Sequence, residues 1–421
     1  MRDKPFELNL FDNYKEVSVF AFLMVLVFSF NLYQKYTLFK EVTASKFYTT
    51  DAKILKQYKK VSKKTGRSYF VLKVKSVDGY SFFTTNYEDL RDINAREISI
   101  GIITEKIDFK SFLSGFYAPS YGIKLHEKEI KFKDKISSYI ANQHEDAKMK
   151  ELFLALFLAD PISKDLREDV SFLGISHLIA ISGFHLGVLF TILYFLFKNV
   201  YIFFQNRYFP YRNIKFDLTI LILALLFAYL SLLGYVPSVV RSFVMMAVGF
   251  FLYHRSFKIV SFEVLFVTIL LILALIPEFL FSIGFWFSVS GVFYIYLFLI
   301  HFSHLKNWQI FLLLNFWVYI TMIPVVNYIF PIFTFHQLYS TFLTMLFSIF
   351  YPLEMFLHIV GFGDLLDGVL LWLFSREGEI FMFKTPFWFL TLYLVFSFFA
   401  IFYKRFIFFL LGLNLVFFFL V

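Results

Sequence analysis

The sequence predicts a mainly α-helical polytopic membrane protein of about 8–11 membrane segments, some broken or re-entrant, with a small N-terminal antiparallel β domain. Two observations predict this fold class. Hydrophobic residues make up 59% of the 421 residues, charged residues make up 17%, and apolar runs long enough to cross a bilayer recur through the second half. Residues 45–130 are instead polar and alternate in the manner of strands.

The first apolar run, VSVFAFLMVLVFSFNLY, covers residues 17–33 and has lysines on both sides. No small-residue cleavage site follows it, so we expect a retained anchor rather than a removed signal peptide. Residues 1–40 therefore form an N-terminal tail and membrane anchor. The chain has no cysteine, which excludes disulfides, thiolate metal sites and a cysteine nucleophile.

Residues 41–133 are expected to form the β domain, an extracytoplasmic OB-like barrel. Hydrophobic and polar residues alternate on both sides of Asp78-Gly79, a dipeptide typical of tight hairpins. Between residues 52 and 77 the chain carries nine lysines or arginines and no acid. A basic face with aromatic side chains suits single-stranded nucleic acid. The candidate DNA contacts are Lys53, Lys56, Arg67, Tyr69, Lys73 and Lys75. The alternative is that lysines simply decorate exposed edges and tips.

Residues 134–175 are expected to form an amphipathic, interfacial helical connector, because the apolar run 151–159 is too short to span a bilayer. Residues 176–421 form the polytopic domain. The loop at 198–216 contains four basic residues and no acid, which marks it as cytoplasmic. Counting segments from this loop places the β domain outside and the N-terminus inside. Prolines and glycines interrupt 331–386, so that region is a candidate for re-entrant structure.

The apolar run 177–197, HLIAISGFHLGVLFTILYFLF, contains polar groups that hydrocarbon cannot satisfy. Ionisable side chains and a Ser-Gly break at this depth need a partner or a water-filled cavity. We therefore expect this run to line a functional path. Its candidate residues are His177, Ser182, Gly183 and His185.

Two further apolar stretches contain polar or small residues. In GYVPSVVRSFVMM (234–246), Pro237 precedes Arg241, and an unpaired arginine in hydrocarbon costs about 3 kcal/mol. Arg241 must therefore snorkel to the headgroups, find a partner or face water. In IPEFLFSIGFWFSVSGVF (276–293), Gly284 and Ser288 line the path or equally mark close helix packing.

These three stretches, in this order, resemble the ComEC family of inner-membrane channels for bacterial DNA uptake. The resemblance rests on GISHLIAISGFHLGVL (174–189), VPSVVRSFVM (236–245) and IPEFLFSIGFWFSVSGV (276–292). Phe184, Ser242 and Trp286-Phe287 depart from the residues usual in the family, which puts the shape of a pore in doubt. The resemblance implies an anchor, an extracytoplasmic OB-like domain and a helical domain that passes single-stranded DNA into the cytoplasm during natural transformation.

The resemblance also implies the setting of the protein. It predicts a multi-pass protein of the bacterial inner membrane whose partners are single-stranded DNA, membrane lipid and a separate DNA receptor, nuclease and cytoplasmic motor. A homo-oligomer is left open. Many family members carry a metallo-β-lactamase-like domain, but these residues contain no HxHxDH cluster, so we expect the short form of the family.

We expect no enzymatic activity, no metal and no cofactor, because the sequence also lacks the P-loop motif GxxxxGK[ST]. Two alternatives to a channel remain. Ser182 in AISG resembles the serine of rhomboid proteases, although Ala180 stands where that motif has glycine and His254 would have to act as the base. GFGD (361–364) matches an aspartyl protease pattern without the required second aspartate. The alternative to the serine protease is a membrane scaffold for other uptake proteins, which would have no enzymatic activity.

Overall fold

A computed structural model of the chain describes residues 10–61, 66–87, 96–126, 131–254, 260–376 and 378–420. The chain divides into two compact units. One unit comprises Met1–Asp12, Ile136–Ile269 and Ile283–Val421, and the other comprises Asn13–Lys135 and Leu270–Ser282. Each unit is described by itself.

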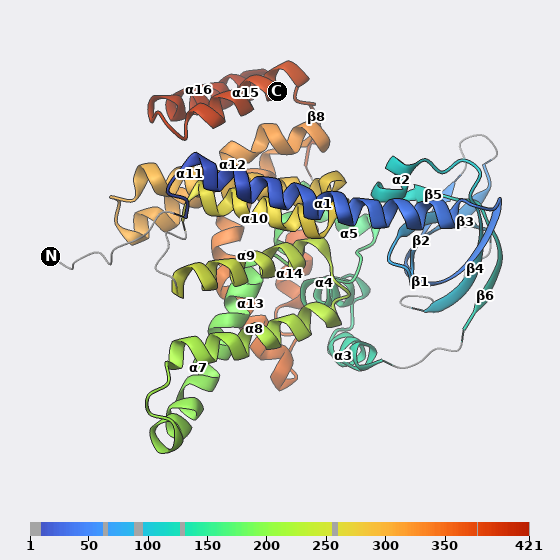
Figure 1. Ribbon diagram of the computed structural model, residues 1–421, viewed down its shortest axis with the longest axis horizontal. Helices are drawn as coiled ribbons and strands as arrows, with labels where there is room; N and C mark the ends of the chain where they lie inside the picture. The colour runs from blue at the N-terminus through green and yellow to red at the C-terminus, as the bar shows by residue number, and fades with distance from the viewer. Residues whose placement is uncertain are drawn as a thin grey trace. The chain divides into compact units, whose positions relative to one another are not determined.

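The smaller unit joins a long apolar helix to a curved β-sheet (Figure 1). Asn13 caps the helix by accepting a hydrogen bond from the Glu16 N–H. The unit contains α1 (Tyr14–Val42), β1 (Phe47–Val61), β2 (Ser68–Ser76), β3 (Ser81–Asn86), β4 (Glu97–Ile103), α2 (Phe109–Ser114), β5 (Phe116–Tyr117) and β6 (Ser120–Leu125).

One short segment of the chain pairs with strands on both sides of this sheet. β1 pairs antiparallel with both β2 and β4, and β2 pairs antiparallel with β3. β5 then pairs parallel with β3, whereas β6, only two residues further on, pairs antiparallel with β4. Residues 116–125 thus supply the outermost strand at each edge of the six-stranded sheet, β5 beside β3 and β6 beside β4.

The predicted alternation along β2 is confirmed. Leu72 and Val74 are fully buried, whereas Lys73 and Lys75, which alternate with them, are partly exposed. The interior is filled by β-branched and aromatic residues, which favour strands and pack well on a pleated surface. They include Ile54, Phe82, Ile98, Ile100 and Ile102.

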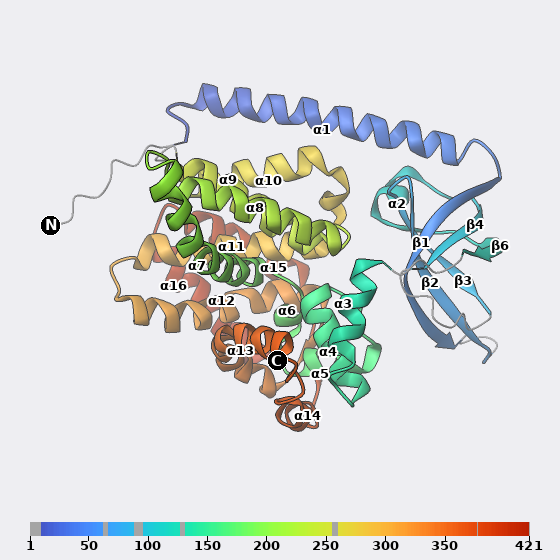
Figure 2. The ribbon, with the colours of Figure 1, turned by 90° about the horizontal axis from the view of Figure 1, so that it is seen from below.

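The larger unit is mainly helical (Figure 2). From the connector onward the chain forms α3 (Phe132–Ala141), α4 (Ala147–Leu158), α5 (Lys164–Phe172), α6 (Ser176–Ile179), α7 (Gly183–Tyr208), α8 (Ile214–Leu232), α9 (Pro237–His254), α10 (Phe262–Leu275), η1 (Pro277–Phe281), α11 (Ile283–Phe302), α12 (Asn307–Ile329), β7 (Ile332–Phe333), η2 (Phe335–Tyr339), α13 (Ser340–Val360), α14 (Asp367–Phe374), β8 (Phe381–Met382), α15 (Phe387–Phe399) and α16 (Arg405–Leu420). η1 and the end of α10 belong to the smaller unit.

Among the described residues, seven helices are long and apolar enough to cross a membrane, namely α1, α7, α8, α9, α11, α12 and the segment Phe335–Val360. Three shorter apolar helices, Phe262–Leu275, Phe387–Phe399 and Arg405–Phe417, accompany them. The chain is therefore a mainly α-helical multi-pass membrane protein with a small β region, as the sequence predicts.

Two regions differ in detail from what the sequence suggests. The connector is broken at 142–146, where Asp146 caps α4, and the apolar side chains of α4 pack into a protein core with α5, α6, α13 and α14. In 331–386, α13 runs without interruption through Pro352 and ends at Gly361, which has the left-handed φ of 87° common at helix ends. α13 is long enough to span a bilayer.

Candidate functional site

The Ser-Gly break predicted from sequence begins α7. Ser182 is the last extended residue before the helix, with φ −123° and ψ 179°. Its backbone N–H donates to Nδ1 of His185 at 3.1 Å, and its hydroxyl lies 3.0 Å from the same nitrogen. His185 therefore takes the place that glutamate or glutamine holds in a capping box.

This contact fixes the proton on the His185 ring. A backbone N–H can only donate, so Nδ1 is the acceptor and the ring proton of the neutral imidazole sits on Nε2. His185 is 1% exposed, and its Nε2 has no hydrogen-bond partner in the part of the chain that the structure describes. The cap thus leaves one buried donor unsatisfied.

α7 meets α9 at Gly183. A Cβ on Gly183 would lie 3.6 Å from the Ser242 hydroxyl, an ordinary van der Waals distance. Ser242 is itself anchored, since its hydroxyl donates to the carbonyl of Ser238 at 2.9 Å. The close approach joins the first predicted motif to the second.

α9 in turn meets α11 at Arg241. Nη1 of Arg241 donates to the Gly284 carbonyl at 2.7 Å, which joins the second motif to the third. The side chain is 6% exposed, and its Nε has no hydrogen-bond partner within the described ranges. In the part of the chain that the structure describes, no ion pair involves Arg241. Arg241 is therefore buried rather than snorkelling, and its charge has no carboxylate partner.

These contacts define the α7–α9–α11 junction, made of Ser182, Gly183, His185, Arg241, Ser242 and Gly284. The other predicted path residues lie near its edges. Pro237 is the first residue of α9, where a missing N–H costs nothing. Ser288 is half-buried one turn along α11 from Gly284. His177 lies on α6 and its Nε2 contacts the Thr344 hydroxyl of α13 at 3.2 Å.

Sequence reasoning missed the part played by α13. The His185 ring packs against Phe347 and Tyr351, with ring centroids 5.3 Å and 4.5 Å away. The helix lies in the region whose prolines and glycines obscured the pattern. Phe347, Tyr351, Glu354 and His358 follow one another at helical spacing, which was the available signal for a face packed against protein.

The basic face of the β domain is built by strand register. Lys53 pairs with Lys75, Lys56 with Lys73 and Lys60 with Tyr69. A regular strand would place residues 53 and 56 on opposite faces, but the register shifts between Ile54 and Lys56. This bulge brings their backbone positions to the same face. The side chain of Lys56 lies outside the described residues.

The other candidates on this face are partly shielded cations. Nζ of Lys73 lies 5.7 Å from the centre of the Phe83 ring. Burial lowers the pKa of Lys73, and for Lys53 burial acts first and repulsion from Lys131 and Lys133 adds to it. Both lysines would gain from an anionic partner. Tyr69 is half-buried, and Arg67 is exposed just before β2.

The residues proposed for enzymatic alternatives are arranged otherwise. His254 sits in the last turn of α9, where Nδ1 faces the Phe250 carbonyl at 3.3 Å, and Ser182 contacts His185 instead. In GFGD, Asp364 is exposed in the turn after α13. No group of three or more His, Cys, Asp or Glu among the described residues is placed to hold a metal ion.

The family described as Competence protein matches residues 158–420, which include the whole α7–α9–α11 junction. No curated protein matches the chain. No solved structure matches it either.

Proposed function

The chain belongs to the competence protein family, and on this basis we propose that it is an inner-membrane channel that passes single-stranded DNA into the cytoplasm during DNA uptake. The family supports a role in competence. The channel role rests on one further observation. Two buried donors in a junction of membrane helices, Nε2 of His185 and Nε of Arg241, have no acceptor among the described residues.

Buried donors without acceptors are costly. Each unsatisfied donor costs about 1–3 kcal/mol, and an unpaired charge costs more. A phosphodiester carries two acceptor oxygens and one negative charge, so the phosphates of a strand would offer each donor an acceptor and Arg241 a counter-charge. Each nucleotide of a passing strand presents the same anion, which allows the contacts to be exchanged from one nucleotide to the next.

The polar groups of the junction also suit a passage through lipid. A polyanion cannot enter dry hydrocarbon, so its path must be wet and walled by protein. We place the start of α7, at Ser182, within the membrane, where the first turn of a helix offers backbone N–H groups. Transporters build substrate sites from such interrupted helices.

The β domain would receive the strand before it reaches the junction. We place this OB-like domain outside the cytoplasm and the N-terminus inside, in the bacterial inner membrane. Its Lys53 to Lys75 face offers cations for phosphates beside Tyr69 and Phe83, on which bases stack. A separate DNA receptor, nuclease and cytoplasmic motor would complete the uptake pathway.

Fluorescent DNA entry into the cytoplasm of a deletion strain tests the channel. The strain is complemented with the unsubstituted chain, Ser182→Ala, His185→Ala or Arg241→Ala. Loss of the Ser182 hydroxyl removes one contact worth about 1 kcal/mol, so we expect entry to fall by no more than about tenfold. His185→Ala and Arg241→Ala remove the two donors and should reduce entry further.

Thr191→Ala is the matched control, because the Thr191 hydroxyl bonds only to the Gly187 carbonyl of its own helix. A serine protease would instead lose all activity in Ser182→Ala, since the nucleophile is indispensable. Purified protein in liposomes separates the channel from a scaffold. Absence of any DNA flux under these conditions would contradict the proposal.

A further inference from the structure

A second polar cluster lies away from the junction, where the loop 142–146 and the start of α14 meet the last turns of α13. Nδ1 of His144 lies 3.0 and 2.9 Å from the two carboxylate oxygens of Asp367. Nε2 of His144 lies 3.0 Å from Nε2 of His358. Nδ1 of His358 lies 2.8 Å from the Glu354 carbonyl oxygen and 3.3 Å from the Glu354 carboxylate.

These groups are withdrawn from water. The side chains of His144 and Glu354 are fully buried, and that of His358 is 5% exposed. The Asp367 side chain, at 14% exposed, is where the cluster reaches solvent. Neither carboxylate oxygen of Glu354 has a hydrogen bond to any residue that the structure describes. The cluster is therefore a buried polar chain that ends in a buried carboxyl group.

The hydrogen bonds of this cluster require one proton more than two neutral histidines and an ionised aspartate would carry. The carbonyl of Glu354 can only accept, so Nδ1 of His358 carries a proton. One proton lies between the two Nε2 atoms, and one lies between Nδ1 of His144 and Asp367. Two neutral imidazoles and an ionised aspartate supply only two protons for these three contacts.

The third proton lies in the contact between His144 and Asp367, and the charged groups around this contact are acidic. The titratable groups that face the pair are Asp367 on α14, Asp364 in the preceding turn and Glu354 on α13, all acidic. α4 presents only the rings of Phe153 and Phe157. Burial raises the pKa of Asp367, while its hydrogen bond with His144 acts in the opposite direction.

The loop 142–146 and the turn after α13 also pack closely around His358. Gln143 donates from Nε2 to the His358 carbonyl at 3.1 Å and accepts from the Gly363 N–H at 2.9 Å. A Cβ on Gly363 would lie 2.8 Å from both Gln143 Oε1 and His358 Nε2. Only glycine fits there without displacing the pair. Gly363 of the GFGD sequence thus serves this packing.

We propose that Asp367, His144 and His358 form a proton-binding site, and that its one extra proton holds the loop 142–146 and the turn 361–367 on α13. The proton acts as a ligand that stabilises the contact of these two segments with α13. α13 contributes Glu354 and His358 to this site from its last turns. One to three turns earlier, its Phe347 and Tyr351 contact His185. Release of the proton would free one end of the helix that packs on the junction.

The pH dependence of unfolding tests this site without DNA. The native state holds a proton that the unfolded chain has lost above pH 7.5, since a free histidine titrates near 6.5. The unfolding equilibrium constant of the unsubstituted protein should therefore rise with pH above 7.5. For each pH unit, this rise should be up to tenfold larger than in His358→Gln or Asp367→Asn. Detergent titration of purified protein between pH 7.5 and 9 measures this difference.

Asp364→Asn is the matched control, because Asp364 is exposed and forms no ion pair in the described structure. It removes one nearby acidic group but no hydrogen bond of the cluster, so it should keep most of the unsubstituted pH dependence. Equal pH dependence in the unsubstituted protein, His358→Gln and Asp367→Asn would overturn the proposal. A second measurement needs no variant. Nitrogen NMR of histidine-labelled protein should show scalar coupling between the two Nε2 atoms through the shared proton, and absence of this coupling at pH 7.5 would also overturn it.

Discussion

At the scale of single residues, the junction depends on one small side chain and one large one. Gly183 allows α7 to approach Ser242, and Arg241 reaches across to the carbonyl of Gly284. Small residues are common where membrane helices pack closely, because they let backbones approach. A buried arginine that bonds to a neighbouring backbone is costly to remove, since the acceptor is left unsatisfied.

Substitutions at Gly183 should have graded effects. The φ of Gly183 is not left-handed, and a methyl group would meet Ser242 at 3.6 Å, so Gly183→Ala should change stability by less than about 1 kcal/mol and preserve DNA entry. Gly183→Leu inserts three more carbons into the contact and should cost about 1–3 kcal/mol. Detergent-unfolding curves and DNA entry measure both effects. Equal behaviour of the two variants would show that α7 and α9 are not in close contact here.

At the scale of elements, the basic face of the β domain is a product of two neighbouring strands. Alternation in the sequence was enough to predict which residues of β2 face inward. The bulge in β1 could not be predicted in this way, because it shifts the register by one residue without a glycine or proline to mark it. As a result, the sequence predicts the lysines as a set but not the pairing of Lys53 with Lys75 and Lys56 with Lys73.

Removing three cations from this face should weaken single-stranded DNA binding in a salt-dependent way. For Lys53→Gln, Lys73→Gln and Lys75→Gln combined, we expect the slope of log K against log salt to fall by about 2 in magnitude, since each phosphate contact contributes about 0.7. Fluorescence anisotropy of a labelled oligonucleotide with the purified full chain measures the slope.

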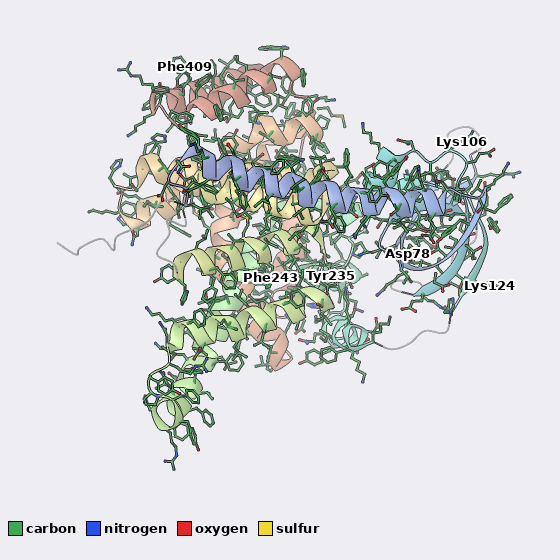
Figure 3. All side chains as sticks on the ribbon, in the orientation of Figure 1. Asp78, Lys106, Lys124, Tyr235, Phe243 and Phe409 are labelled. Carbon is green, nitrogen blue, oxygen red and sulfur yellow. The ribbon has the colours of Figure 1, made fainter. Side chains whose placement is uncertain are left out.

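The matched control makes the same change in charge elsewhere on the domain. Lys106, Lys110 and Lys124 are exposed, and Figure 3 shows Lys106 and Lys124 on its outer parts. Their combined replacement by glutamine should leave most of the slope intact. If both triple variants lose the same slope, binding follows net charge and the Lys53 to Lys75 face has no special role.

At the scale of the whole chain, the sequence predicts the membrane class and the residues of the junction but not their tertiary partners. Apolar length identifies the long helices, and the three motifs contain the residues that meet at α7, α9 and α11. The contribution of α13 arises from contacts between residues far apart in sequence, such as His144 with His358 and His185 with Tyr351. A pattern within one segment cannot reveal such contacts.

The orientation of the chain in the membrane is the prediction on which inward transport depends. Arg212 lies in the loop between α7 and α8, Lys198 and Arg207 lie on the second half of α7, and Lys215 lies in the first turn of α8. Basic residues are retained on the cytoplasmic side. α8 then crosses, so Tyr235 at its far end and the β domain should both lie outside. Figure 3 shows Tyr235 at the turn between α8 and α9.

Single cysteines test this orientation directly, because the chain contains no cysteine of its own. We expect Lys106→Cys and Tyr235→Cys to react with a membrane-impermeant maleimide on intact spheroplasts. Tyr211→Cys, in the exposed turn between α7 and α8, should react only after the membrane is opened. Tyr211 and Tyr235 lie at opposite ends of one helix and serve as controls for each other. Labelling of Tyr211→Cys but not Tyr235→Cys on intact cells would reverse the orientation, and the β domain could then not receive DNA from outside.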